Sequence, residues 1–100
     1  MKTAAEVLRD GAITFENRNA VYGNNFLNVG QAMTGLFPNG MIIKTEDDWN
    51  RLHIFLLAIV KMSRYANNWE VGGHEDSIHD AMVYDAMLAM IDNEIKEREP

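Results

Sequence analysis

Apolar residues recur at helical spacing in separate segments of the chain, and short polar breaks divide those segments. A first helix is predicted over residues 4–16, because Thr3-Ala-Ala-Glu6 forms a capping box ahead of an apolar stripe. Residues 17–23 are predicted to break the pattern. A second helix is predicted over residues 25–36, where apolar side chains repeat every three or four positions and the breakers Phe37-Pro-Asn-Gly40 follow.

The second half of the chain predicts two longer helices. Thr45 and three acids begin a helix that extends to about Ala66, and its apolar residues cover more than one side, which is typical of a central helix. After a loop at 67–73, the last helix is predicted over residues 75–97, with a charged tail at about 96–100. No segment alternates for long at the period of a strand. We therefore predict one all-α domain spanning residues 1–100, a compact four-helix bundle-like fold with long antiparallel third and fourth helices.

Charge and composition exclude several classes of protein. A net charge of −6 without a basic tract argues against an extended nucleic-acid partner. The absence of cysteine excludes disulfides, zinc–thiolate sites and thiol catalysis. The most apolar run, Leu52–Met62, is too short to span a membrane, and the N-terminus lacks the apolar core of a signal peptide. We expect a cytoplasmic protein with no membrane partner.

A candidate site lies where the third helix ends and the fourth begins. Lys61 and Arg64 are one helical turn apart, and Glu75, Asp76 and Asp80 follow the intervening loop. Asp76 and Asp80 project from one face of a helix, and antiparallel pairing brings them close to the two cations. The carboxylates suit Mg²⁺ and the cations suit phosphate. Salt bridges alone, together with acids that complement a helix dipole, are the competing interpretation.

Four further residues are candidates for ligand binding. Arg18 and Tyr22 form either a second wall of the pocket or part of a turn. Trp69, in the loop, stacks on a base or closes the end of the bundle. Tyr84 lies one turn beyond Asp80 and extends the stripe of polar residues on the last helix.

These motifs, in their order and spacing, resemble a family of small phage and prophage proteins of unknown function. The likeness covers about Arg18 to Met90 and depends on R-x-x-x-Y-G-x-N-F from Arg18, K-x-x-R from Lys61 and H-E-D-S-x-x-D-x-x-x-Y from His74. That family is distantly similar to the all-α nucleoside triphosphate pyrophosphohydrolases of MazG type, which implies a helical fold and Mg²⁺-dependent hydrolysis. The E-E-x-x-E run of the MazG type is absent here, and only Asp76 and Asp80 correspond to its second acidic motif.

Three functions follow from the residues and the resemblance. In an enzyme, Asp76 and Asp80, with Glu75, would hold Mg²⁺ on a nucleotide while Lys61 and Arg64 neutralise the leaving pyrophosphate. In a binding protein, the same cations would sequester a nucleotide or cyclic nucleotide unchanged, as an anti-defence protein that removes a signal made by bacterial defence. The third function is a structural or host-protein-inhibiting phage protein. The small size of the chain favours a homo-oligomer with the site near a subunit boundary, in the host cytoplasm if the chain is phage-encoded.

Overall fold

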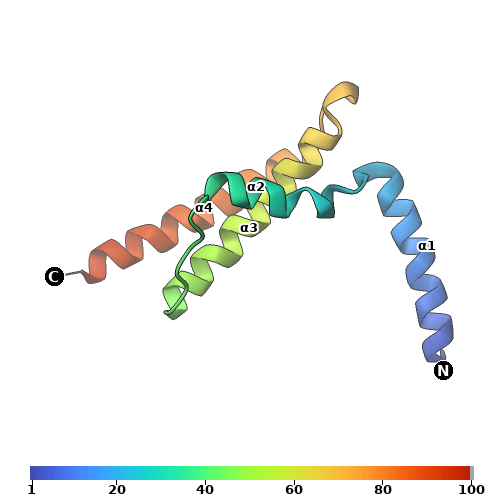
Figure 1. The fold of residues 1–100 in the computed structure, drawn as a ribbon, viewed down its shortest axis with the longest axis horizontal. Helices are drawn as coiled ribbons and strands as arrows, with labels where there is room; N and C mark the ends of the chain where they lie inside the picture. Colours follow the sequence, from blue (N-terminus) through green and yellow to red (C-terminus); the bar gives the residue numbers. More distant parts are fainter. Residues whose placement is uncertain (100) are drawn as a thin grey trace.

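The computed structural model describes residues 1–99, apart from the side chains at positions 21, 22 and 25. Over these residues the regular structure is entirely helical, which confirms the predicted fold class (Figure 1). The elements, in order, are α1 (Ala4–Tyr22), the short 3-10 helix η1 (Asn25–Leu27), α2 (Val29–Leu36), α3 (Glu46–Asn67), the 3-10 helix η2 (Trp69–Val71) and α4 (Glu75–Arg98).

The predicted break after residue 16 is wrong, because α1 continues to Tyr22. Residues 17–20 are polar or small but include neither proline nor glycine, so nothing in them prevents the helix from continuing. The helix ends where Gly23 adopts a φ of 62° and donates its N–H to the carbonyl of Asn19. The second predicted helix is divided into η1 and α2, and η2 lies within the predicted 67–73 loop.

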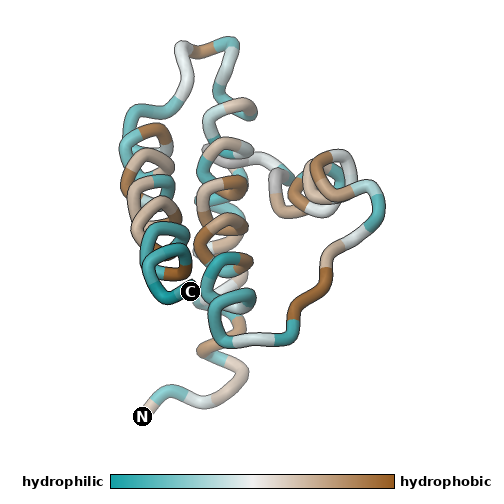
Figure 2. Tube along the Cα trace, turned by 90° about the vertical axis from the view of Figure 1, so that its left-hand side faces the viewer, coloured by the Kyte–Doolittle hydropathy of each residue, from teal (hydrophilic) through white to brown (hydrophobic). Residues whose placement is uncertain are grey.

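The two long helices α3 and α4 form an antiparallel hairpin that holds the only buried side chains of the described residues (Figure 2). These side chains are Ala58, Ser77 and Ala81, and their small size lets the two backbones approach closely. Three ion pairs cross the hairpin along its length: Lys61 with Asp80, Arg51 with Asp92, and Arg98 with Asp47. The hairpin is therefore held by a narrow apolar seam and by charges along its sides.

One further side of α3 is covered by α2 and by the segment that follows it. The Phe37 and Phe55 rings meet edge to face with centroids 5.4 Å apart. Residues 41–44 pass over α3 without regular structure, and half-buried Ile43 helps to line a small hollow of about 170 Å³. Thr45 then caps α3, where its hydroxyl accepts the Asp48 N–H and the Asp48 carboxylate accepts the Thr45 N–H.

Helix α1 extends away from the hairpin instead of packing along it (Figure 1). It contacts the rest of the chain near its C-terminal end, where the Phe15 and Phe26 rings meet edge to face at 6.2 Å. The radius of gyration is consequently 17.2 Å, against about 13 Å for a compact domain of this length. Leu8 and Val7 on α1 remain exposed. No helix in the described part of the chain has the length and apolar character needed to cross a membrane.

Candidate functional site

Lys61 and Asp80 face each other across the α3/α4 hairpin, as the antiparallel pairing predicts. The Lys61 Nζ lies 3.0 Å from the Asp80 Oδ2, and the lysine side chain is only 19% exposed. The turn before α4 sets this register, because Gly72 and Gly73 both have a positive φ that glycine adopts at little cost. The half-buried cation is thus matched by a carboxylate from the neighbouring helix.

The acidic residues predicted to bind Mg²⁺ do not come together as a group of three. Glu75 and Asp76 are exposed in the first turn of α4, where they complement the helix dipole. Among residues 1–99 no three His, Asp or Glu side chains are arranged to hold a metal ion. A Mg²⁺ ion that arrives with a nucleotide needs only one or two carboxylates, so the metal-binding role of Asp76 and Asp80 stays a prediction.

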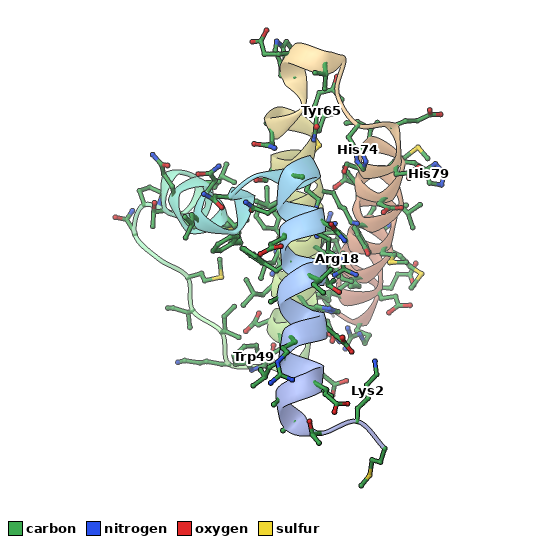
Figure 3. All side chains as sticks on the ribbon, turned by 90° about the vertical axis from the view of Figure 1, so that its right-hand side faces the viewer. Lys2, Arg18, Trp49, Tyr65, His74 and His79 are labelled. Carbon is green, nitrogen blue, oxygen red and sulfur yellow. The ribbon has the colours of Figure 1, made fainter. Side chains whose placement is uncertain are left out.

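A second arrangement of cations lies between α1 and α3. Arg18 from α1, labelled in Figure 3, and Arg64 from the last turns of α3 line the same hollow, whose volume is about 350 Å³. Half-buried Asn19 and the aromatic residues Phe15 and Phe26 complete most of its wall, with small residues beside them. We name this cavity the Arg18–Arg64 hollow. It carries two guanidinium groups and no carboxylate in its lining.

The local sequence explains how this hollow forms. Phe15, Arg18 and Asn19 share one face of α1 because they are three and four residues apart. Gly23 then turns the chain towards α3, and a side chain at this position would meet the Asn67 amide at 2.8 Å. Phe15, Asn19 and Phe26 were not predicted as binding residues, although Phe26 ends the motif that begins at Arg18. The spacing of Phe15 and Asn19 from Arg18 indicates a shared face of α1. Their position in one hollow with Arg64 depends on the turn at Gly23, which the spacing does not predict.

Trp69 and Tyr84, two further predicted binding residues, lie outside the Arg18–Arg64 hollow. Trp69 in η2 is 68% exposed and packs its ring edge to face against Tyr65, with centroids 6.1 Å apart. Tyr84 is half-buried on α4. The side chain of Tyr22, which was predicted as part of the pocket wall, lies outside the described residues.

His74 and Ser77 form a close polar pair at the start of α4. The His74 Nδ1 and the Ser77 Oγ are 2.6 Å apart, and His74 is the N-cap residue of the helix. A serine beside a histidine can act as a nucleophile, but the Ser77 side chain is only 1% exposed. Substrate cannot reach it, so the pair fixes the first turn of α4 and takes no part in nucleophilic catalysis.

Comparison with known proteins gives no further guide to the site. No protein-family model, curated protein or solved structure matches this chain. The function is therefore argued from the geometry of the chain itself.

Proposed function

We propose that this chain is a small nucleotide-phosphate-binding protein and that the Arg18–Arg64 hollow is its anion site. The observation that carries the proposal is the presence of two guanidinium groups, from different helices, in the wall of one hollow of an acidic protein. Guanidinium groups present planar donors that match phosphate oxygens in pairs, so two of them suit a di- or triphosphate better than a single anion.

The remaining wall suits the rest of a nucleotide. Phe15 and Phe26 offer ring faces or edges to a base, and the Asn19 amide can both donate and accept hydrogen bonds. The volume of about 350 Å³ lies within the range of small-molecule sites. Lys61, one turn before Arg64 on α3, is paired with Asp80 and lies outside the lining of the hollow, so the two arginines supply its positive charge.

The second candidate function is Mg²⁺-dependent hydrolysis of a nucleoside triphosphate. The observation that favours it is Asp80, which lies beside Lys61 and one helical turn from Asp76. Asp76 and Asp80, with Glu75, would hold a Mg²⁺ ion, which supplies Lewis acidity at the phosphate when bound. Retention of a linear or cyclic nucleotide without reaction, as in sequestration of a defence signal in the host cytoplasm, needs only the arginines and is the function we favour.

A nucleotide panel tests the proposal. Purified protein is incubated with linear triphosphates and with cyclic di- and trinucleotides, with and without Mg²⁺, and the free nucleotide is measured by mass spectrometry before and after heat denaturation. A nucleotide that disappears from solution and returns intact on heating is the expected result. Monophosphate and pyrophosphate formed only with Mg²⁺ would support hydrolysis instead, and no change across the panel would contradict both functions.

Arginine variants locate the site. We expect Arg18→Gln and Arg64→Gln each to weaken nucleotide binding at least tenfold in calorimetry, because each removes one guanidinium from the hollow. Arg9→Gln is the matched control, since Arg9 lies on α1 outside the hollow and its loss changes the net charge equally. Equal weakening by all three substitutions would indicate a general charge effect and contradict the assigned site.

A further inference from the structure

The side of α4 that faces away from α3 is apolar over most of its length. Met82 and Met90 are 60% and 58% exposed. His79 also points outward from this side of the helix (Figure 3). A stripe at spacings of three and four consists of Ile78, Met82, Ala86, Ala89 and Met90. Because the opposite side of α4 already packs on α3, this part of the helix has apolar side chains on two opposite sides, and only one of those sides is covered.

Charge does not interrupt this outer stripe. The acids that flank it are held elsewhere, because Asp80 pairs with Lys61 and Asp92 pairs with Arg51 on the α3 side of the helix. Asp85 lies at the edge of the stripe, and neither Lys nor Arg occurs on α4 before Lys96. The stripe is therefore a neutral surface on a protein of net charge −6, and it can meet an identical surface without repulsion at the contact.

A single chain exposes more surface than a compact monomer of the same mass. The accessible surface is 7829 Å², whereas a compact monomer of 11.4 kDa exposes about 5,800 Å². Part of this excess of roughly 2,000 Å² belongs to the projecting α1, and the outer side of α4 contributes the exposed side chains of Ile78, Met82 and Met90. Two hairpins that meet through this outer side would place each α4 between the α3 of its own chain and the α4 of its partner, so that both apolar sides of α4 are covered.

We infer that two copies of this chain pack the outer faces of their α4 helices together, antiparallel, about a two-fold axis beside Ala86. The stripe is self-complementary about that residue, because Met82 and Met90 lie four positions on either side of it. An antiparallel pairing places Met82 of each copy opposite Met90 of the other, with the small Ala86 side chains at the centre of the contact. This interface is independent of the proposed nucleotide site.

A single introduced cysteine tests the position of the axis. The chain has no cysteine, so Ala86→Cys creates one thiol per copy, and the two thiols would lie close together at the axis. We expect mild oxidation to convert most of this variant to a covalent dimer. Val71→Cys, on η2 and 80% exposed, is the control and is expected to stay largely monomeric on denaturing gels. Absence of a covalent Ala86→Cys dimer, or equal crosslinking of both variants, would overturn the proposed axis.

A charge variant tests the interface itself by sedimentation. The full-length protein is expected to sediment as a dimer at micromolar concentration. Met82→Glu combined with Met90→Glu is expected to weaken the dimer at least a hundredfold, because four carboxylates would then meet in the contact. Val71→Glu is the matched control and should leave the dimer unchanged. A monomeric parent protein, or a dimer that survives the double substitution, would overturn the inference, and circular dichroism establishes that each variant remains helical.

Discussion

Asp80 is the residue for which the two candidate functions make opposite demands. Its carboxylate lies 3.0 Å from the Lys61 ammonium, and that pair lies next to the turn of α3 that carries Arg64. In a hydrolase the carboxylate would have to bind a metal ion, either through its second oxygen or by leaving Lys61. In a binding protein it only holds the lysine in place and lowers the positive charge available to a ligand.

We predict that Asp80→Asn strengthens nucleotide binding in Mg²⁺-free buffer by roughly a factor of three, because it removes a negative charge near the phosphate site. Calorimetric titration of the variant and the parent protein measures this change. Asp85→Asn is the control, since Asp85 is exposed on α4 and its substitution alters the net charge by the same amount. If Asp80→Asn instead abolishes a Mg²⁺-dependent turnover, Asp80 belongs to the metal site of an enzyme.

Asp48 makes the stability of the protein dependent on pH. The backbone N–H groups of Lys44 and Thr45 donate to its carboxylate and hold its pKa below the ordinary value. Because the pKa is lower in the folded state, the stabilisation is complete above about pH 4 and is lost as the pH falls through the folded-state pKa.

We therefore expect Asp48→Asn to lower the melting temperature at pH 7, and we expect the difference from the parent protein to shrink below about pH 4. Thermal melts followed by circular dichroism between pH 2.5 and 7 measure this. A difference that is constant with pH would show that the cap does not depend on the charge of Asp48.

At the scale of the helices, local signals predicted α3 and α4 closely. Thr45 with its three following acids marks the start of α3, and the two glycines at 72 and 73 mark the turn before α4. The end of α1 was not predicted, because arginine favours a helix and asparagine disfavours one only slightly, so neither residue stops it. The polar residues after position 16 were interpreted as the end of the helix, whereas the helix ends at Gly23.

The two halves of the candidate site also differ in whether the sequence could predict them. The Lys61–Asp80 pair could be predicted because both residues lie on consecutive helices joined by a short turn. The position of Arg64 beside Arg18 could not, because it depends on the angle at which α1 leaves Gly23 and on packing between residues far apart in the sequence. No periodicity along the chain encodes that angle.

The turn before α4 gives a prediction for the hairpin. At Gly73 the φ is 86° and an added side chain would collide with the Tyr65 ring, so Gly73→Ala should destabilise the fold by about 1–3 kcal/mol. Gly35→Ala is the matched control within α2, where nothing lies within 4 Å of the added carbon. That change should stabilise the protein by up to about 1 kcal/mol. Chemical denaturation of both variants measures the two effects, and equal effects would contradict the role of the turn.

At the scale of the whole molecule, the extended shape links folding to assembly. A hairpin with three buried side chains among the described residues has little core of its own, and the inferred dimer supplies the rest. Folding should then depend on the amount of protein present, as it does for chains whose folded state requires a partner copy.

We predict that a tenfold dilution lowers the melting temperature by about 4 °C, because dissociation accompanies unfolding. Differential scanning fluorimetry over a hundredfold range of concentration measures this dependence. The combined Met82→Glu and Met90→Glu variant serves as the comparison and should melt at a lower temperature that does not change with concentration. A concentration-independent melt of the parent protein would contradict the coupling.

The single turn at Gly23 makes α1 a lever. The helix has 19 residues and is therefore about 28 Å long, and it is anchored near only one end. A ligand that contacts both Arg18 and Arg64 fixes the angle of this lever, and a rotation of about 10° would move the far end by roughly 5 Å. Ligand binding near one end of α1 would thus change the position of the other end. A spin label at Lys2 could detect this change without contacting the ligand.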